Sequence, residues 1–318
     1  MKKKTPSLLF VTDPWNTLDH SRDTTLRLAE EAMILGARCF ISENRSISLI
    51  DGTPHAEVEE FLRIESPRTP KNIRRGKIKT TKLENFDSIF YRTDPPVDLA
   101  YLLPLQILAA TPHAKIHTAP AALFALNEKW APAELGSLFP KSLVSASAAR
   151  LSAFVTLTGK CVLKPLYLAQ SKGVAVLDPS KLGRKALELR LKKATEGERL
   201  PVIVQKFLPG ISKGETRLWF VDGKLLAAVK KIPRSGEVII DMDQGGRLGR
   251  TKLSAKDRKS AKKIGAFLKK NRILFAAIDL IDGKVTDFNH TSPGLLVAME
   301  ELLGQNLARL ALVPVFGG

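Results

Sequence analysis

The stretch A-I-D-L-I-D-G-K-V-T-D-F-N-H-T-S-P, residues 277–293, reads as two short strands joined by a turn at Asp282-Gly283. It carries Asp279, Asp287 and Asn289 among apolar neighbours. Mg²⁺ takes oxygen ligands of this kind, usually one or two carboxylates together with a substrate's phosphates. The alternative is a surface hairpin with solvated acids, which a lone D-x-N pattern favours.

The register of this hairpin separates the two alternatives. With a two-residue turn, Asp279 would pair with Thr286, and Asp287 would point to the opposite face because side chains alternate along a strand. An odd-length loop, or a bulge at the glycine, would bring Asp279 and Asp287 onto one face, with Asn289 beside Asp287. The metal hypothesis therefore predicts a register, and it also requires a nucleotide site elsewhere in the chain.

Length and composition indicate a folded protein with more than one core. A chain of 318 residues with 44% hydrophobic residues can form two or three subdomains. No run of about 18 apolar residues occurs, so no transmembrane helix is expected. Segment 7–11 is too short for a signal peptide and predicts a first buried strand. Cys39 and Cys161 lie in apolar surroundings and are expected to be reduced core residues, which is typical of a cytoplasmic protein.

The net charge of +18 is concentrated in two segments, 71–82 and 252–272. Such a charge fits a nucleic-acid or membrane-surface partner, or an enzyme that acts on acidic substrates. In 252–272 the lysines lie opposite an apolar stripe marked by Ile264, Phe267 and Leu268, which predicts a helix with a solvated basic face. Stacking aromatics are not interleaved with the lysines, so a nucleic-acid partner is not expected.

Strands and helices alternate over residues 7–118, which predicts a parallel sheet covered on both faces. Gly36 is placed to end the first helix. The expected strands are 8–12, 38–42, 88–91 and 114–117, and the expected helices are 23–35 and 98–110. Segment 71–82 is expected to be a loop or an edge hairpin, and 119–140 is expected to be helical and connecting.

An α+β unit is expected to begin near residue 142, followed by a third group of elements. The expected strands are 161–166, 173–177 and 202–208, followed by the hairpins 217–221/224–229 and 273–289. The expected helices are 181–195, 252–272 and 296–311, and Ser254 with Asp257 is expected to cap the second of these. The predicted domains are 1–122, 123–200 and 201–318.

Three basic residues are candidates for binding phosphate. Lys164 lies inside an apolar strand, where an ammonium is unfavourable unless it meets an anion; the alternative is that it reaches out to water. Lys129 follows Asn127-Glu128 at a predicted helix start. Arg217 begins a hairpin strand, where it can neutralise phosphate or lie at an edge.

Nine sequence blocks occur in an order that resembles bacterial glutathione synthetase, a member of the ATP-grasp superfamily, over residues 8–312. The blocks are D-P-W (13–15), R-D-T-T (22–25), R-T-D-P-P-V-D (92–98), N-E-K (127–129), V-L-K-P-L (162–166), V-Q-K-F-L-P (204–209), E-T-R-L-W-F-V-D-G (215–223), G-G-R (245–247) and D-F-N-H-T-S-P (287–293). The resemblance implies an α/β and α+β chain with the ATP-grasp fold. It further implies an N-terminal Rossmann-like (pre-ATP-grasp) domain, a small lid subdomain and a C-terminal subdomain with the metal site.

The resemblance implies an ATP-dependent carboxylate–amine ligase that forms glutathione from γ-glutamylcysteine and glycine through an acyl phosphate. It also implies ATP and Mg²⁺ or Mn²⁺ as cofactors, a cytoplasmic location, small-molecule substrates and a homo-oligomer, with no membrane partner. Two alternatives stay open: a ligase for another acid and amine, and a nucleotide-binding protein without ligase activity.

The resemblance also assigns roles to individual residues. Lys129 and Lys164 would contact the nucleotide phosphates. The adenine side would be formed by Gln205, Lys206, Phe207 and Leu208. Mg²⁺ would be held by Asp279, Asp287 and Asn289, and Arg217 would stabilise charge on the transferred phosphoryl group. The peptide substrate would lie near Asp13, Arg92 and Ser292.

The sequence departs from the family pattern in two loops. The family's glycine-rich K-P-L-D-G-M-G-G-R-G reads K-P-L-Y-L-A-Q-S-K-G here (164–173), with only the last glycine kept. The family's substrate-covering loop, approximately G-G-E-T-R-G-N, is replaced at 236–242, so that Ile239 stands in place of its arginine and Asp241 in place of its asparagine.

Two smaller departures lie in the hairpin. Asp287 stands in place of a glutamate, which keeps a competent metal ligand. His290 stands in place of a valine and is expected to be a hydrogen-bonded strand histidine rather than a catalytic one. The residues implied for nucleotide and metal are therefore present, and the two loops are changed.

Overall fold

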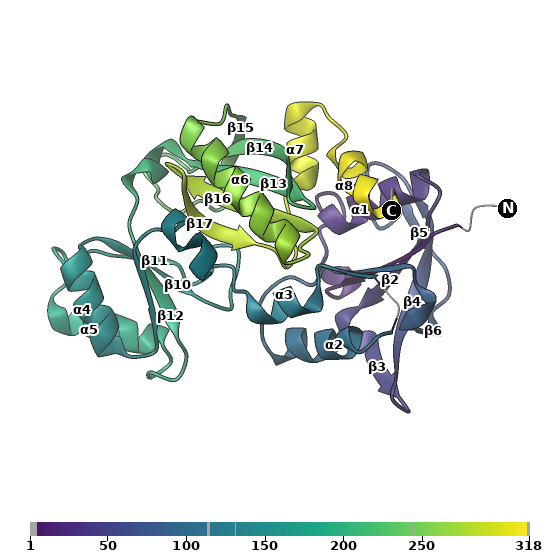
Figure 1. Ribbon diagram of the computed structural model, residues 1–318, viewed down its shortest axis with the longest axis horizontal. Helices are drawn as coiled ribbons and strands as arrows, with labels where there is room; N and C mark the ends of the chain where they lie inside the picture. The colour runs from purple at the N-terminus through teal and green to yellow at the C-terminus, as the bar shows by residue number, and fades with distance from the viewer. Residues whose placement is uncertain (1–4, 113–114, 131, 243, 317–318) are drawn as a thin grey trace.

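A computed structural model describes residues 5–112, 115–130, 132–242 and 244–316, and its strands form three sheets. Figure 1 shows the N-terminal sheet on the right and a four-stranded sheet with α4 and α5 on the left. A five-stranded sheet covered by α6 lies between them.

The centre of the N-terminal sheet is parallel, as the alternation of strands and helices predicts. β1 pairs with both β2 and β7, and β8 follows β7. These parallel strands and their helices are β1 (Ser7–Thr12), α1 (Thr24–Ile34), β2 (Arg38–Glu43), β7 (Ser88–Tyr91), α2 (Leu99–Ala109) and β8 (Lys115–His117). Ala114, expected in the last strand, lies outside the described residues. Gly36 has a φ of +90° just after α1, which confirms its role in ending that helix.

The sheet is not purely parallel, and this part of the expectation is wrong. β4 pairs antiparallel with β2 and carries an antiparallel extension. The added strands are β3 (Ile47–Ile50), β4 (Thr53–Ile64), β5 (Ile73–Arg75) and β6 (Lys79–Lys82). Pro54 and the acids of β4 obscure a strand pattern, because proline and charged residues are rare in strands. Segment 71–82 forms β5 and β6, but each of them pairs with β4 and not with the other, so neither the loop nor the edge hairpin predicted for this segment is correct.

The second sheet is antiparallel, with the order β11-β10-β12-β9. Its strands and helices are β9 (Ser142–Ser145), α4 (Ala148–Thr158), β10 (Cys161–Pro165), β11 (Ala175–Leu177), α5 (Arg184–Ala194) and β12 (Val202–Lys206). β12 begins beyond the expected domain boundary at residue 200, yet it pairs with β10 and β9 in this sheet.

The third sheet is also antiparallel, with the order β15-β14-β13-β16-β17. Its elements are β13 (Glu215–Val221), β14 (Lys224–Ile232), β15 (Arg247–Arg250), α6 (Ala255–Lys270), β16 (Phe275–Ile281) and β17 (Lys284–Asn289). The side chains of Ser254 and Asp257 form the predicted capping box at the start of α6. The expected C-terminal helical stretch divides at Gly304 into α7 (Leu296–Leu303) and α8 (Leu307–Phe316).

Short helical segments connect these units. They are α3 (Pro120–Ala125) and the 3₁₀ helices η1 (Trp15–Thr17), η2 (Asn44–Ser46), η3 (Leu83–Asn85), η4 (Ala133–Leu138) and η5 (Pro209–Lys213). None of the helices in the described part of the chain is long and apolar enough to cross a membrane.

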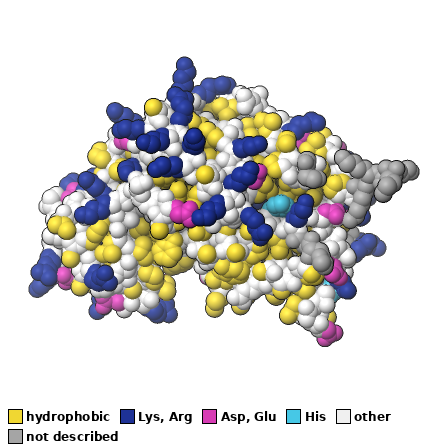
Figure 2. Space-filling view, viewed as in Figure 1, with side chains coloured by type: hydrophobic (Ala, Val, Ile, Leu, Met, Phe, Trp, Pro, Cys, Tyr) yellow, Lys and Arg dark blue, Asp and Glu magenta, His cyan; other side chains and the backbone are white. Residues whose placement is uncertain are grey.

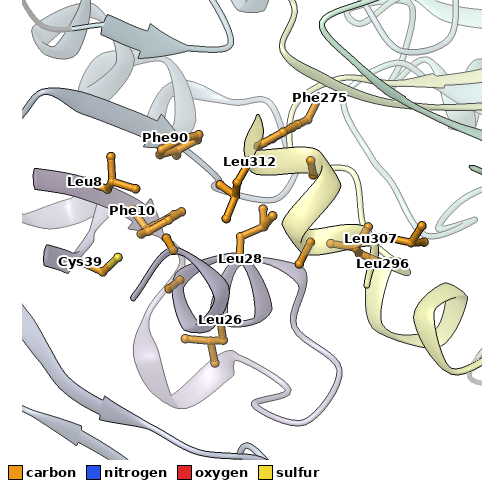
Figure 3. Packing of buried hydrophobic residues seen from close by; sticks show 14 of the residues in the cluster. Leu8, Phe10, Leu26, Leu28, Cys39, Phe90, Phe275, Leu296, Leu307 and Leu312 are labelled. Carbon is orange, nitrogen blue, oxygen red and sulfur yellow. The ribbon is translucent and has the colours of Figure 1, made fainter. Parts of the chain in front are cut away.

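One hydrophobic core joins the N-terminal sheet to the C-terminal unit. Phe10 and Phe90 stack with ring centroids 4.9 Å apart, and Phe275 of β16 stacks on Phe90 at 6.0 Å. Figure 3 shows Leu312 of the C-terminal helix and Leu28 of α1 packed beside these rings. The N-terminal and C-terminal units therefore share apolar contacts rather than lying apart on a linker.

Both cysteines are buried and free, as the sequence predicts. Burial raises the pKa of Cys39 to about 12 and that of Cys161 to about 11. Thiols with such values are protonated at neutral pH and behave as small apolar side chains.

Candidate active site

The β16–β17 hairpin has the register that the metal hypothesis predicts. Asp279 pairs directly with Asp287, whereas Leu280 pairs with Val285. Thr286 is the extra residue, so the bulge lies next to Asp287 and not at Gly283, where it was expected. Paired residues share a face, and Asp279 and Asp287 therefore lie on the same side of the sheet.

Asp279 is 1% exposed and is held by two cations. Arg217 donates from Nε to Oδ1 at 2.8 Å and from Nη2 to Oδ2 at 2.7 Å, and Lys231 Nζ donates to Oδ2 at 3.1 Å. Burial raises the pKa of Asp279, but the two cations outweigh it and hold the value at about 2. The bidentate geometry fixes the guanidinium plane of Arg217.

Lys231 and Glu215 belong to the same network, although neither is among the site residues predicted from the sequence. Lys231 Nζ donates to Glu215 Oε1, and Thr286 Oγ1 donates to Glu215 Oε2 at 3.2 Å. Both residues line the cleft described below. Glu215 lies two residues before Arg217 on β13, and this spacing puts both side chains on one face. The spacing of Glu215 and Arg217 in the sequence could have indicated that Glu215 belongs to the site. Lys231 is identified only by the strand register, in which it pairs with Glu215.

A cleft opens between the four-stranded and five-stranded sheets. Its empty volume is about 880 Å³ with open solvent included. Seven of the thirteen residues predicted for the site line it: Lys129, Lys164, Gln205, Lys206, Phe207, Leu208 and Asp287. The structure thus brings together residues from four separate sequence blocks.

Two lysines and one carboxylate meet in this cleft. Lys164 Nζ donates to the carbonyl oxygen of Thr286, so the ammonium lies inside the cleft and not in bulk water. Burial lowers the pKa of Lys164, and the nearby Asp287 and Glu215 oppose that effect. Lys129 Nζ lies 3.9 Å from Asp287 Oδ1. A phosphate group placed here would meet two ammonium groups already desolvated by the protein.

Backbone hydrogen bonds to neighbouring segments fix the segment that is predicted to contact the adenine, residues 205–208. Lys206 N donates to Lys141 O at 2.8 Å, and Phe207 N donates to Lys160 O at 3.0 Å. The side chain of Gln205 donates to Lys129 O at 3.3 Å. The apolar side chains of Phe207 and Leu208 line the cleft and provide a wall for a flat, weakly polar ring.

The oxygen atoms of the hairpin fit a divalent cation. Asp287 Oδ1 is buried and accepts no hydrogen bond among the described residues. Asn289 donates Nδ2 to Ala277 O at 3.0 Å, which leaves its Oδ1 as the acceptor for a cation. The carboxylate of Asp279 has about four acceptor positions, and three of them accept hydrogen bonds from Arg217 and Lys231, so one position is left for a cation. No group of three His, Cys, Asp or Glu side chains with metal-binding geometry occurs in the described ranges, so this set depends on the amide.

The two altered loops contact each other across the cleft. Ser171 Oγ donates to Ile240 O at 3.2 Å. Ile240 packs into a small buried cluster with Ile211 and Ile281, which we name the apolar latch. Gln170 and Ser171 have φ values of +55° and +58°, a region that glycine adopts more easily than other residues. The loop at 167–173 thus keeps left-handed turns without the glycines of the family pattern.

The residues predicted near the peptide substrate gather at the carboxyl ends of β1 and β7. Asp13 accepts from the backbone N–H of Asp94 at 2.8 Å, and Asp94 forms a side-chain hydrogen bond with Ser292. Arg92 donates Nη2 to Pro293 O at 3.0 Å, and its buried Nη1 has no acceptor among the described residues. Burial raises the pKa of Asp94 to about 6. This position is the switch point of the sheet, where open α/β sheets bind ligands.

Glu128 organises the segment that links the two ends of the site. Its Oε1 accepts from His290 N at 2.9 Å, from Thr291 N at 3.1 Å and from Thr291 Oγ1 at 2.8 Å. No local sequence pattern indicates this role of Glu128, although the acid stands inside the N-E-K block. His290 Nδ1 is hydrogen-bonded to Phe288 O, whereas Nε2 has no partner in the described part of the chain. Only one of the two ring nitrogens therefore has the hydrogen bond that was predicted for this histidine.

Comparison with known proteins gives consistent matches along the chain. Residues 7–123 match the model of the "prokaryotic glutathione synthetase, N-terminal domain", and residues 128–304 match the "prokaryotic glutathione synthetase, ATP-grasp domain". The glutathione synthetase of Parasynechococcus marenigrum is 33% identical, with 94% of this chain and 95% of the relative covered. That of Thermosynechococcus vestitus is 29% identical, with 97% and 99% covered. The crystal structure of D-cycloserine synthetase DcsG is similar in fold, with a TM-score of 0.67, 16% identity and coverage of 96% and 98%.

Proposed function

The chain belongs to the prokaryotic glutathione synthetase family, and on that premise we propose that it joins γ-glutamylcysteine to glycine with ATP. The predicted ATP-grasp fold and ligase class agree with the matched family models. The observation that carries the proposal is the meeting of Lys129, Lys164 and the unbonded Asp287 Oδ1 in one cleft.

The proposed reaction has two steps. A carboxylate oxygen of the acid attacks the γ-phosphorus of ATP, the bond to the β-phosphate oxygen breaks, and ADP leaves. The amine nitrogen of glycine then attacks the acyl carbon and loses a proton, and the C–O bond breaks to release phosphate. The protein's task is to hold both substrates and to stabilise charge on the transferred group.

Arg217 and Lys231 are proposed to stabilise the transferred phosphoryl group. Asp279 and Glu215 hold the two cations in fixed positions, so the groups need little reorganisation during the reaction. Lys129 and Lys164 are proposed to bind the nucleotide phosphates, and the 205–208 segment is proposed to contact the adenine. This division is supported by the cleft lining, which includes the cations Lys129 and Lys164 together with the apolar side chains of Phe207 and Leu208.

A divalent metal accompanies ATP in this family, and we propose Mg²⁺ at Asp287, Asn289 and the remaining oxygen position of Asp279. Such an ion would neutralise phosphate charge. The unbonded Oδ1 of Asp287 supports this choice, and Asp279 is the weakest of the three ligands because two cations already surround it.

The acid substrate is proposed to lie at Asp13, Arg92 and Ser292. Arg92 is buried, and its free Nη1 suits a carboxylate of the peptide. Asp13 and Asp94 suit the ammonium group of the same molecule, because a buried acid close to another acid favours a cation.

The proposal includes three further features of the protein. The proposed domains are 1–122, 123–206 and 207–318. The last boundary differs from the predicted one at residue 200 because β12 (Val202–Lys206) belongs to the four-stranded sheet. The buried thiols support a cytoplasmic location. A homo-oligomer is proposed, as the family resemblance implies.

A second candidate function is supported by the loop at 236–242. Val238 and Ile239 line the cleft where the family pattern carries a polar loop with an arginine. A loop without a cation is poorly suited to an acidic peptide, so a ligase for a different acid or amine is the alternative function.

Release of ADP by the purified protein tests these functions. Mg²⁺-ATP, γ-glutamylcysteine and glycine are supplied together and then omitted one at a time. ADP formation that requires both γ-glutamylcysteine and glycine is the expected result. ADP formation only with other acids or amines would favour the second candidate, and nucleotide binding without turnover would contradict both.

A further inference from the structure

The basic segment 252–272 forms the solvent side of α6 and its flanks, and the proposed function does not use it. Its one acid, Asp257, is buried in the capping box. Figure 2 shows lysines and arginines over the region where Figure 1 places α6. We name this surface the α6 face, and its nine exposed cations are Lys252, Lys256, Arg258, Lys259, Lys262, Lys263, Lys269, Lys270 and Arg272.

The α6 face lies on the other side of the five-stranded sheet from the active site. Ile264 of α6 belongs to one buried cluster with Leu218 and Ile278 of that sheet. Arg217 and Asp279 are the chain neighbours of these two strand residues, so they point to the opposite face. The cations of the α6 face therefore do not reach the cleft, and binding of ATP or of an acidic substrate there does not account for them.

The segments packed against α6 bring few acids to this face. η4 contacts α6, and its Glu134 pairs with Lys270 at 2.7 Å. The turns 222–224 and 282–284 also meet α6, and each of them carries one aspartate and one lysine, which leaves the local charge unchanged. Among the described residues, the pair of Glu134 and Lys270 is the one ion pair of the α6 face.

The other basic segment, 71–82, differs from the α6 face because acids surround it. Its strands β5 and β6 pair with β4, and that strand carries Glu57, Glu59 and Glu60. Arg75 of β5 forms an ion pair with Glu59. Cations therefore gather without matching acids at the α6 face and not at segment 71–82.

The helix is fixed to the sheet, so its cations are held along a straight line. A Cβ at Gly223 would lie 2.4 Å from the carbonyl oxygen of Gly265, which shows how closely the first turn approaches α6. At the second turn, Ser260 Oγ donates to Gly283 O at 2.8 Å. The 16 residues of α6 span about 24 Å. A nucleic-acid duplex carries about 14 phosphates over that length, at one charge per about 1.7 Å.

The side chains of the α6 face distinguish between polyanions as partners. Among the described residues, no large apolar side chain is exposed in segment 252–272, so an anionic membrane finds no apolar anchor there. The missing aromatics count against single strands, whose bases stack on such side chains. A duplex keeps its bases stacked on each other, and lysine and arginine bind it through its phosphates alone.

We propose that the α6 face binds double-stranded nucleic acid through its phosphates, without reading the sequence. Lys259, Lys262 and Lys263 form the centre of the contact, because residues three and four apart lie side by side on a helix. The site is separate from the cleft and does not depend on the reaction proposed above. It revises the expectation from the sequence that nucleic acid is not a partner.

The test is the binding of a fluorescently labelled DNA duplex of about 20 base pairs and mixed sequence, followed by anisotropy between about 0.05 and 0.3 M salt. The purified full chain is expected to bind with log K falling by about 0.9 per unit of log salt for each phosphate contacted. The triple variant Lys259→Gln, Lys262→Gln and Lys263→Gln is expected to flatten this slope by about 3. It is also expected to weaken binding about 100-fold at about 0.1 M salt.

The matched control is the triple variant Lys185→Gln, Lys192→Gln and Lys193→Gln on α5, where the three lysines are also exposed. Both triple variants remove three positive charges, so a difference between them reports where the charges lie. The α5 variant is expected to bind within about twofold of the wild type, because its charges lie beyond the screening length from the contact. If the α6 variant lowers the thermal unfolding temperature, the double variant Lys256→Gln and Lys269→Gln replaces it, with binding weakened about tenfold.

The outcomes separate this site from general attraction between opposite charges. Equal weakening in the α5 and α6 triple variants would overturn the proposal, because binding would then follow net charge alone. Absence of duplex binding at about 0.05 M salt would also overturn it. Tighter binding to the single strand, to vesicles with about 30% phosphatidylserine or to polyglutamate would overturn it in favour of a single-stranded, membrane or acidic protein partner.

Discussion

The β16–β17 hairpin and the two loops that meet over the cleft use different forces to shape the same site. In the hairpin, Asp279 is held by charge-assisted hydrogen bonds from Arg217 and Lys231. In the loops, Ile240 is held by apolar contacts and by one hydrogen bond from Ser171. The ionic network sets positions of charged groups with strict geometry, whereas the latch tolerates different shapes because apolar contact is non-directional.

This difference explains why one region keeps the family pattern and the other does not. A change of Asp279, Arg217 or Lys231 leaves at least one charged group of this buried network without its partner, which is strongly unfavourable. A loop that closes by apolar contact can replace glycine, arginine and asparagine with other residues and still cover the cleft. We therefore expect substitutions in the hairpin to affect the chemical step and substitutions in the latch to affect nucleotide exchange.

The largest effect is expected for Asp287→Asn in the hairpin. It removes the unbonded carboxylate oxygen of the proposed metal site and keeps the side-chain shape. A loss of about 4 kcal/mol of transition-state stabilisation corresponds to a fall in kcat of about 1,000-fold. The rate of ADP formation is measured at several Mg²⁺ concentrations.

Asp282→Asn is the matched control, because Asp282 is an exposed acid in the turn of the same hairpin. It is expected to retain the wild-type rate. Near-normal activity of Asp287→Asn would remove Asp287 from the metal site.

The next largest effect is expected for Lys231→Met. Loss of one preorganised cation at the transferred group is expected to lower kcat by about 100-fold, with little change in the KM for ATP. Lys231→Arg keeps the charge and is expected to recover most of the rate. Equal losses in both variants would indicate that Lys231 acts only in packing around Asp279.

A smaller effect is expected in the latch for Ile240→Ser. Replacing a buried isoleucine removes roughly 1–2 kcal/mol of apolar contact from the closed loops, so ADP is expected to dissociate about tenfold faster. Dissociation is followed by stopped flow with a fluorescent ADP analogue. Glu237→Ser, at an exposed position of the same loop, is the control, and an unchanged rate for Ile240→Ser would show that the latch does not limit release.

The smallest effect is expected for Asp94→Asn. Asp94 lacks a partner like Arg217, which donates two hydrogen bonds to the carboxylate of Asp279. Burial raises the folded-state pKa of Asp94 from 3.8 to about 6, so between these values the folded state binds more protons than the unfolded state. Stability should therefore fall as pH rises from about 4 to about 6, and the loss persists at pH 7. Asp94→Asn is expected to be about 1 kcal/mol more stable than the wild type at pH 7 and to lose this advantage below pH 4. Urea unfolding at several pH values measures this difference, and a parallel pH dependence of the two proteins would contradict it.

Local patterns predicted a large part of the fold. Alternating strands and helices indicated the parallel core around β1, and Ser254 with Asp257 marked the start of α6. The antiparallel extension at β3 and β4 escaped prediction because its strands carry proline and many acids. β4 joins the sheet by pairing with β2, from which η2 and β3 separate it in the sequence.

The candidate site was predictable where a residue's role follows from its neighbours in the chain. Asp287 and Asn289 flank an apolar residue in a strand, and Lys164 interrupts an apolar strand, so their types alone suggested ligands. Glu128 and Lys231 were missed because their partners are remote: Glu128 bonds to Thr291, and Lys231 bonds to Asp279.

The sequence by itself determined which elements form and which side chains carry charge into them, because these properties depend on residues a few positions apart. Only the tertiary structure decided that Asp279 is held by two cations and that Thr286 is the bulged residue. It also decided that the two altered loops close on each other through Ile240. These features depend on strand register and on packing between distant segments, and no local pattern encodes the distance between such segments.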